Sequence, residues 1–461
     1  MPKLRACVIG SGFAGLSAAT ELAANNYQVT ILEKNKSPGG RARRFEEEGF
    51  VFDMGPSWYW MPDVFERYFE RFDRKVSDYY HLERLDPSYA VIFNQDEFVD
   101  IPAKMDEMEE LFESIEPGSA SQLREFLKQA AYKYEVGIND LVYRPGRSLT
   151  EFLDIRLLKG ILKMDVFQSM AKHVRKFFTH PKLIQLMEFP VLFLGALPEN
   201  TPALYSLMNS ADISLGTWYP DGGRFKIIEG MLSLAKEKGV AVILDQEVTG
   251  FEYKGDQISK VLTKDNSYEF DVVVASADYH HVDQHLLDKK YANYTPDYWE
   301  NRTMAPSCLL YYLGIDKKLD KLQHHNLFFD TDFKKHAEEI YTTKEWPEDP
   351  LFYVSVVSKT DPGSAPEGME NVFLLIPVAT GLEDTEDIRD RYLDMILDRL
   401  TRLTGEDIKK HIVYKRSYAP SDFIADYHAF KGNAYGLANT LMQTALLKPG
   451  LKNKKLRNLY Y

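Results

Sequence analysis

Three glycines near the N-terminus have a spacing that could bring the main chain close to a bound group. Gly10, Gly12 and Gly15 follow a short apolar stretch over 4–9 and open a run of helix-forming residues over 16–24. In a strand–turn–helix unit, the first glycine permits the tight turn, the second lets the backbone approach a pyrophosphate, and the third lets helix and strand pack closely. The phosphates then bind amide groups at the helix N-terminus, where the helix dipole favours negative charge.

An acidic residue stands where a dinucleotide site needs one. Residues 27–32 predict a second strand that ends at Glu33, 18 residues after Gly15. A carboxylate at this place can accept hydrogen bonds from a ribose. Strand, helix, second strand and terminal acid together predict a dinucleotide-binding unit.

A second glycine pair helps to choose the dinucleotide. Gly39 and Gly40 precede Arg41 in the sequence SPGGRA over 37–42. Paired glycines beside an arginine supply another close backbone approach and a cation for the same diphosphate. A nicotinamide-binding unit does not need this second clamp, whereas a flavoenzyme that buries its cofactor does. We therefore expect FAD; the alternative is that the two glycines form a plain turn between strands.

Composition and charge limit the partners. The 461 residues carry a net charge of −13, and an acidic chain does not attract nucleic acid through its overall field. Cys7 and Cys308 supply neither a metal cluster nor a disulfide framework and fit a reducing cytoplasm. The longest near-continuous apolar run, over 189–198, is shorter than the ~20 residues of a spanning helix. Since the first residues lead directly into a strand pattern, we expect no signal peptide.

The remaining patterns predict an α/β fold. Solid β-branched runs over 240–244 and 270–275 are typical of parallel strands, and they bracket a hairpin signal at 254–256. Another strand is expected over 372–379, and helical patterns dominate 103–208 and 383–404. We expect a Rossmann-like FAD-binding domain that is interleaved with a substrate domain of mixed sheet and helices. The first is expected to take 1–90, 215–290 and 415–461, and the second 91–214 and 291–414.

The middle of the chain is both basic and apolar. Between Arg156 and Lys182 there are seven basic residues and one acid, Asp165. This pattern is typical of a surface helix that rests on an anionic bilayer. The alternative is an amphipathic helix that packs on its own core and exposes a solvated lysine face.

Further motifs make the chain similar to a known family. The glycine triplet, Glu33, GGRA over 39–42 and FDMGP over 52–56 resemble the N-terminus of the flavin amine oxidase superfamily. Within it, the whole chain resembles the bacterial and fungal phytoene desaturases through WYPDGG over 218–223, ASAD over 275–278, YLGI over 312–315, HHN over 324–326, KTDPGSAP over 359–366 and KGNAYG over 431–436. The resemblance implies that FAD is bound by Gly10, Gly12, Phe13, Ala14, Gly15, Glu33, Lys34, Gly40, Arg41, Met54, Gly55, Pro56, Tyr219 and Val248.

The resemblance also implies an activity, the stepwise dehydrogenation of an acyclic carotene from phytoene towards lycopene. Hydride would pass to FAD, a proton would be lost, and oxygen or a quinone would reoxidise the flavin. One alternative is a carotenoid 3,4-desaturase that acts on a later, hydroxylated or monocyclic carotene. Others are an amine oxidase and a carotenoid-binding protein without catalysis. Because a carotene must come from the bilayer, we expect the segment 156–198 to dock on the inner face of the cell membrane.

No residue pattern identifies the catalytic base. Asp53 is a candidate because its motif lies near the cofactor, but a carboxylate there would also fix the loop by accepting backbone amides. The adjacent histidines at 324–325 point to opposite faces of a strand and cannot chelate together, and the pair at 280–281 is excluded on the same ground, so no metal is expected. Asp278 is expected to cap a helix that begins at Tyr279.

The end of the sequence differs from the family pattern. In the family, a strand like that at 458–461 leads into a glycine- and proline-rich segment and a helix that complete the flavin site. Here the sequence stops at Tyr461. We therefore expect a fragment of a longer product, in which the natural continuation would tighten flavin binding.

Overall fold

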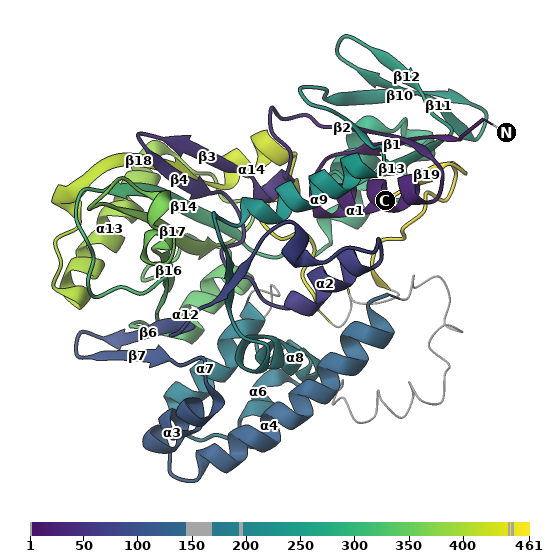
Figure 1. Ribbon diagram of the computed structural model, residues 1–461. Helices are drawn as coiled ribbons and strands as arrows, with labels where there is room; N and C mark the ends of the chain where they lie inside the picture. Colours follow the sequence, from purple (N-terminus) through teal and green to yellow (C-terminus); the bar gives the residue numbers. More distant parts are fainter. Residues whose placement is uncertain (1, 144–167, 193–196, 441–442, 444–446) are drawn as a thin grey trace.

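The computed structural model describes residues 2–143, 168–192, 197–440, 443 and 447–461 (Figure 1). A five-stranded sheet occupies the right of the molecule in Figure 1 and a seven-stranded sheet the left, with a group of helices beneath. The α/β fold expected from the sequence is confirmed.

The five-stranded sheet is parallel throughout, in the order β19-β13-β1-β2-β9. Apolar residues alternate between its faces: Ala6 and Val8 share a core with helices α1 and α9, whereas Cys7 and Ile9 share one with a smaller sheet. These elements confirm the predicted strands and the helix that opens at the glycine triplet. They are β1 (Arg5–Ile9), α1 (Phe13–Ala24), β2 (Gln28–Leu32), α9 (Phe225–Glu237), β9 (Ala241–Ile243), β13 (Val272–Ala275) and β19 (Leu459–Tyr460).

The smaller sheet contains the predicted hairpin. Its three antiparallel strands are β10 (Val248–Lys254), β11 (Gln257–Thr263) and β12 (Ser267–Glu269). The apolar side chains Phe251, Ile258 and Val261 pack in the core that contains Cys7 and Ile9. The small sheet therefore covers the face of the parallel sheet opposite α1 and α9.

The seven-stranded sheet is mixed, in the order β18-β14-β17-β16-β15-β6-β7. In the fully buried β14, Leu309 and Tyr311 share a core with α13, whereas Cys308 and Leu310 face the opposite core. Only the β15–β6 pairing is parallel among the described strands of this sheet. The elements are β6 (Tyr89–Asn94), β7 (Glu97–Ile101), β14 (Ser307–Ile315), β15 (His325–Phe328), β16 (Phe352–Ser355), β17 (Glu370–Val378), α13 (Glu386–Thr404) and β18 (Ile412–Tyr418).

Helices at the bottom of Figure 1 close the second face of this sheet. Aromatic residues such as Phe112, Phe126 and Phe178 are buried among them in the core that also contains Cys308 and Leu310. Residues 144–167 and 193–196, which include 156–167 of the predicted basic segment, lie outside the described residues. The helices are α3 (Met105–Ile115), α4 (Ser119–Tyr134), α6 (Met170–Val174), α7 (Pro181–Leu192) and α8 (Leu207–Asn209).

Short elements connect the two large sheets. The hairpin of β3 and β4 packs Phe45 and Phe52 against Tyr312 of β14. The remaining short elements are β3 (Arg44–Glu47), β4 (Phe50–Asp53), α2 (Pro62–Glu70), β5 (Leu82–Arg84), β8 (Trp218–Pro220), α10 (Tyr279–His281), α11 (Pro296–Glu300), α12 (Phe333–Glu338) and α14 (Pro420–Tyr427).

The division into two interleaved domains stays a prediction. The expected boundary at 415 falls inside β18, which is hydrogen-bonded to β14 of the seven-stranded sheet. In the last segment assigned to the FAD-binding domain, only β19 joins the parallel sheet among the described strands.

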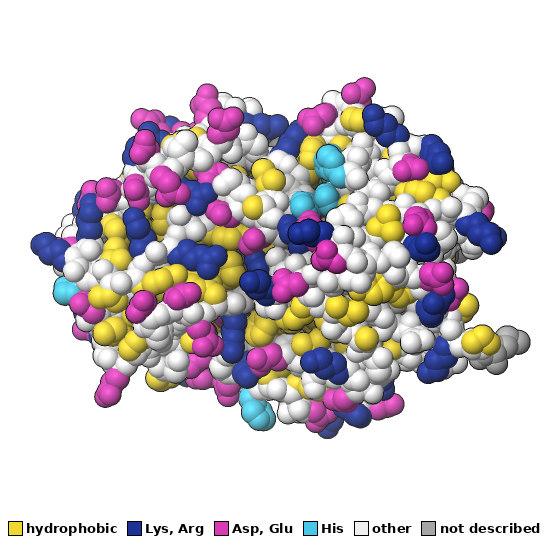
Figure 2. All heavy atoms as spheres, turned by 90° about the horizontal axis from the view of Figure 1, so that it is seen from above, with side chains coloured by type: hydrophobic (Ala, Val, Ile, Leu, Met, Phe, Trp, Pro, Cys, Tyr) yellow, Lys and Arg dark blue, Asp and Glu magenta, His cyan; other side chains and the backbone are white. Residues whose placement is uncertain are grey.

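Charge is mixed over the upper face of the molecule. Figure 2 shows acidic and basic side chains interspersed on this face, with histidines near its centre. Among the described residues, no helix has both the length and the apolar character needed to cross a bilayer.

Candidate functional site

A cavity of about 390 Å³ opens at the carboxyl ends of β1, β2 and β13. Ligands of parallel α/β sheets bind at this edge. Helix α1 points its N-terminus here, with Gly12 as the N-cap, so its free amide groups can bind phosphate. The sequence-predicted residues that line the cavity are Gly10, Gly12, Phe13, Ala14, Glu33, Lys34, Gly40, Arg41, Pro56 and Val248.

The two glycine loops meet at this cavity. A Cβ atom on Gly15 would lie 2.0 Å from the carbonyl oxygen of Gly10, so helix α1 packs on the turn at a distance that excludes a side chain. Gly40 has a φ of +57°, and a Cβ atom there would lie 3.2 Å from Cα of Gly12. The second glycine pair therefore approaches the first loop closely, as a second clamp on one ligand requires.

Glu33 is buried at the end of β2 and is held by its own chain. One carboxylate oxygen accepts the backbone N–H and the hydroxyl of Ser11, at 2.8 and 2.6 Å. The other accepts the backbone N–H and the side-chain amide of Asn35, at 2.9 and 3.1 Å. A ribose hydroxyl that binds this carboxylate would compete with these donors. The sequence alone did not show that Ser11 and Asn35 bind Glu33.

Arg41 provides a cation with an unused donor. Its Nε atom is buried and has no hydrogen-bond partner among the described residues. Its guanidinium carbon lies 5.3 Å from the ring centroid of Tyr427, and both residues line the cavity. A partly buried guanidinium with a free N–H is suited to a diphosphate.

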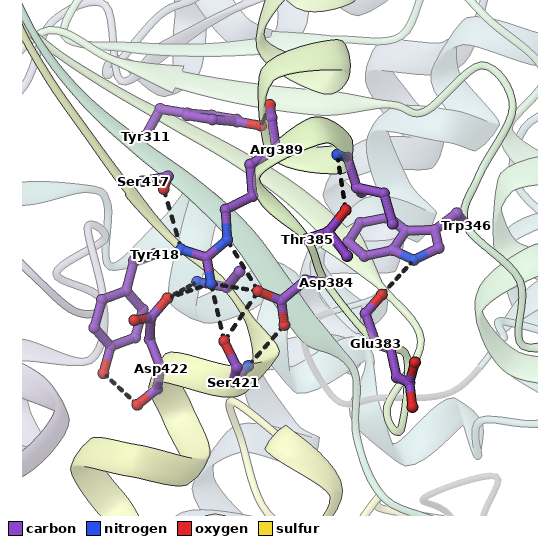
Figure 3. Close-up of polar contacts among 12 residues, drawn as sticks. Tyr311, Trp346, Glu383, Asp384, Thr385, Arg389, Ser417, Tyr418, Ser421 and Asp422 are labelled. Carbon is purple, nitrogen blue, oxygen red and sulfur yellow. Dashed lines mark hydrogen bonds and ion pairs between the residues drawn. The ribbon is translucent and has the colours of Figure 1, made fainter.

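Helix α14 brings Tyr427, and His428 after it, to the same cavity. Its first turn is fixed by Arg389 of α13 (Figure 3). The guanidinium of Arg389 forms ion pairs with Asp384 and Asp422, and it donates hydrogen bonds to Ser417 and Ser421. This network couples one wall of the cavity to the seven-stranded sheet.

A pair of stacked histidines was not predicted from the sequence. The rings of His281 and His428 lie 3.9 Å apart with an 8° angle between their planes, and both line the cavity. Nε2 of His428 lies 2.7 Å from a carboxylate oxygen of Glu247. Burial and the neighbouring His428 lower the pKa of His281 to about 3, so His281 is neutral at neutral pH.

An apolar cavity of about 250 Å³ continues from the first one. The two share the lining residues Arg41, Pro56 and Tyr427. A third cavity of about 80 Å³ shares a further set with the second. That shared set is Cys308, Tyr353, Leu375 and Tyr435. Of the predicted residues, Met54 and Gly55 line the second cavity together with Pro56.

Asp53 and Tyr219 do not line the glycine-loop cavity. Asp53 lines a neighbouring cavity of about 200 Å³, which shares Phe13 and Pro56 with it. The Asp53 carboxylate accepts the backbone N–H groups of Arg224 and Phe225 at the start of α9, at 2.8 and 3.1 Å. Burial raises the pKa of Asp53. Tyr219 donates a hydrogen bond to Asp361 at 3.1 Å and, with Asp53, lines a separate cavity of about 20 Å³. The contacts of Asp53 are therefore those of the loop-fixing role.

The histidine pairs form no metal site in the described part of the chain, where no group of metal-binding side chains is found. His324 and His325 instead bond to Thr360 and Tyr353 through their Nδ1 atoms. Asp278 accepts the backbone N–H of His281 at 3.0 Å and caps α10, as expected.

A comparison with protein families assigns the chain to a known group. The profile described as flavin containing amine oxidoreductase matches residues 13–461. The chain belongs to this family. The cofactor of this protein is therefore a flavin. The glycine loops form a cradle of the kind that FAD requires.

Curated relatives show to which group of flavin oxidoreductases the protein belongs. It is 40% identical over 455 residues to the carotenoid 3,4-desaturase of Haloarcula japonica. This match covers 98% of this chain and 92% of the relative. It is 31% identical to the zeta-carotene-forming phytoene desaturase of Myxococcus xanthus, over 99% of this chain and 89% of the relative. The protein is an FAD-dependent oxidoreductase of the carotenoid desaturase family.

Solved structures show the same fold at low identity. An oxidoreductase from Methanosarcina mazei matches with a TM-score of 0.61 and 16% identity, over 99% of this chain and 94% of that one. Cyclohexylamine oxidase from Brevibacterium oxydans matches with a TM-score of 0.59 and 14% identity, over 100% of this chain and 92% of that one.

Proposed function

We propose that this desaturase introduces a carbon–carbon double bond into an acyclic carotenoid that lies in the second and third cavities. The observation that supports this most directly is the apolar lining that runs on from the glycine-loop cavity. A long hydrocarbon needs such a lining. An amine substrate would need a polar or acidic pocket, and the described lining of the second cavity contains no acidic residue.

FAD would be held by the predicted residues around the first two cavities. Gly10, Gly12, Gly40 and Arg41 would bind the diphosphate, and Glu33 the ribose. Bound FAD supplies a hydride acceptor. The remaining proposed contacts are Phe13, Ala14, Gly15, Lys34, Met54, Gly55, Pro56 and Val248, whereas Tyr219 would act only through the loop that it fixes.

The chain's own residues would then orient the substrate, exclude water and stabilise positive charge. Removal of hydride from an allylic methylene leaves a delocalised cation. Aromatic faces can stabilise such a cation through their ring quadrupoles. The rings available around the second cavity are Trp58, Trp60, Tyr353, Phe373, Phe423, Tyr427 and Tyr435.

Two substrates fit this proposal. The relative at 40% identity favours 3,4-desaturation of a late acyclic carotenoid, which we take as the first candidate. Phytoene, the substrate expected from the sequence motifs, is the second and is favoured by the Myxococcus xanthus relative at 31% identity. The reaction is the same in both cases, and the substrates differ in the groups that the cavity must accept.

The deciding experiment is an anaerobic titration. The FAD-loaded protein receives phytoene or a hydroxylated acyclic carotene in anionic liposomes, and the visible flavin absorption is recorded. Bleaching by the hydroxylated carotene alone, followed by longer-wavelength polyene bands when oxygen or a quinone is admitted, supports 3,4-desaturation. Bleaching by phytoene supports the second candidate. A flavin that neither carotene bleaches would contradict both.

Membrane docking through the segment 156–198 remains part of the proposal. Arg175 is not free for this purpose because it pairs with the buried Glu188. Lys172 is exposed at α6 and therefore gives the cleaner test. Lys172→Glu should reduce sedimentation with anionic liposomes, while Lys264→Glu, on the distant β11–β12 turn, should not. Equal sedimentation of both variants and the wild type would place the docking surface elsewhere.

A further inference from the structure

A hydrogen-bonded tyrosine–histidine pair stands at the junction of the two apolar cavities. Tyr353 of β16 lines both cavities and is 5% exposed. Its hydroxyl oxygen lies 2.5 Å from Nδ1 of His325 on the neighbouring strand β15. His325 is fully buried. Tyr353 therefore brings a phenol to a mostly apolar passage, and its hydroxyl contacts the imidazole of His325 as well as the hydroxyls of Ser57 and Ser355.

The imidazole is held in an arrangement that suits proton acceptance. Trp58 stacks on His325, with ring centroids 4.3 Å apart and planes 14° from parallel. Burial, His324 and Arg224 lower the pKa of His325 well below its ordinary value, so the ring is neutral at neutral pH. With its proton on Nε2, which has no partner among the described residues, Nδ1 offers a lone pair to the Tyr353 hydroxyl.

Desaturation needs a proton acceptor next to the reacting carbons. After hydride has left the allylic methylene, the hydrogen on the adjacent carbon is strongly acidic, because its loss turns a cation into a neutral conjugated alkene. A weakly basic oxygen is then sufficient as the acceptor. Asp53 does not meet this need, since its carboxylate accepts amides of α9 and lines neither of the two apolar cavities.

We propose that Tyr353 is the catalytic proton acceptor of the desaturation and that His325 is the positioning residue that takes the phenol proton in turn. The carbon–hydrogen bond breaks and its electron pair becomes the new π bond. The proton goes to the Tyr353 oxygen, whose own proton passes to Nδ1 of His325. Bound FAD would supply the acceptor for the hydride and its two electrons, so the positive charge on His325 would be balanced overall. This assignment rests on the proposed function.

The test compares Tyr353→Phe and His325→Gln with the wild type in single turnovers under anaerobic conditions, in H₂O and in D₂O. We expect Tyr353→Phe to form the polyene product about 100-fold more slowly or worse, because general-base catalysis contributes about that much. FAD content and the temperature of unfolding should stay at wild-type values. The wild-type rate should fall in D₂O, since the phenol proton exchanges with solvent, and both variants should lose this isotope effect.

Two neighbouring side chains supply matched controls. His324→Gln changes the adjacent buried histidine, whose Nδ1 atom lies 2.7 Å from Thr360 and not next to Tyr353. Tyr435→Phe removes a hydroxyl at the same cavity junction, where its nearest recorded partner is Sγ of Cys308 at 4.0 Å. Both controls should keep the solvent isotope effect.

Three outcomes would overturn the assignment. The first is that Tyr353→Phe forms product at the wild-type rate. The second is that the two control variants also lose the solvent isotope effect. If Tyr353→Phe fails to retain FAD, His325→Gln decides by the same readouts, and an unchanged isotope effect in that variant is the third. Failure of the proposed function looks different. In that case no carotene bleaches the flavin of the wild-type protein, and this result is visible without any variant.

Discussion

Gly15 stands where helix α1 leaves the first turn, and the space there excludes a methyl group. In Gly15→Ala, the new Cβ atom would lie 2.0 Å from the carbonyl oxygen of Gly10, so the turn or the helix must move. Overpacking of this kind costs about 1–3 kcal/mol of unfolding free energy. Because the same turn carries the amides that we propose to bind the phosphates, we expect FAD affinity to fall about tenfold or more, which corresponds to about 1.4 kcal/mol. Fluorescence titration with FAD and urea unfolding measure the two effects.

Gly250→Ala is the matched control for that substitution. A Cβ atom on Gly250 in β10 would meet nothing closer than the carbonyl oxygen of Leu286 at 3.9 Å. We expect wild-type FAD affinity from this variant. Wild-type affinity from Gly15→Ala as well would show that the close packing at the turn does not set the binding site.

Sequence reasoning found the site residues whose role is dictated by the local chain. The glycine triplet and Glu33 could be predicted because a turn and a strand end within one unit bring them together. The stacking of His281 on His428 could not, since it joins two segments that only the tertiary fold brings together. Tyr219 was assigned to the cofactor through a motif, whereas its hydroxyl donates to Asp361 outside the glycine-loop cavity.

Helix α14 depends on one buried cation. Nε of Arg389 lies 2.9 Å from Asp384, and Nη2 lies 2.9 Å from Asp422 in the first turn of α14 (Figure 3). Arg389→Ala would leave the buried Asp384 without its partner, which costs about 3–5 kcal/mol for such pairs. We expect a lower temperature of unfolding and weaker FAD binding, because α14 carries Tyr427 to the cavity. Calorimetry and FAD titration test both effects.

Arg391→Ala provides the comparison on the same helix. Arg391 is exposed, and its guanidinium lies 5.4 Å from the ring centroid of Tyr392. Exposed substitutions of this kind change stability by about 0.5 kcal/mol or less. If the two variants unfold at the same temperature, the Arg389 network does not anchor α14.

The main strands of the parallel sheet could be predicted because they are short buried runs with turn signals at their ends, whereas in the seven-stranded sheet only the strand over 372–379 was given a range from its sequence. Their pairing could not be read as easily. Residues 412–418 form a strand whose partner β14 lies about a hundred residues earlier in the chain, and the domain boundary expected at 415 divides it. Because the paired strands are far apart in the chain, no local sequence pattern indicates that they pair.

At the scale of the whole molecule, buried histidines make the fold sensitive to acid. Burial lowers the pKa of His324 to about 3 and that of His336 to about 4, and it holds the pKa of His325 well below its ordinary value. The unfolded chain therefore binds protons below about pH 6.5 that the folded chain does not bind. Each of the three groups then removes up to about 1.4 kcal/mol of stability per pH unit as the pH falls.

Buried acids work in the opposite direction, because burial raises the pKa values of Asp53, Asp278 and Asp212. Burial raises the pKa of Asp212 to about 7, so the folded chain keeps a proton that the unfolded chain has lost, and this group stabilises the fold as the pH falls from about 7 to about 4. We expect the histidines to dominate, because His280 and His281 also have pKa values lowered to about 4 and about 3. The urea midpoint should therefore fall steadily between about pH 6.5 and about pH 4, and His336→Gln should make that fall shallower because one of these protons no longer binds. A midpoint that is constant over this range, or a slope unchanged in His336→Gln, would mean that these imidazoles are hydrated in the folded protein.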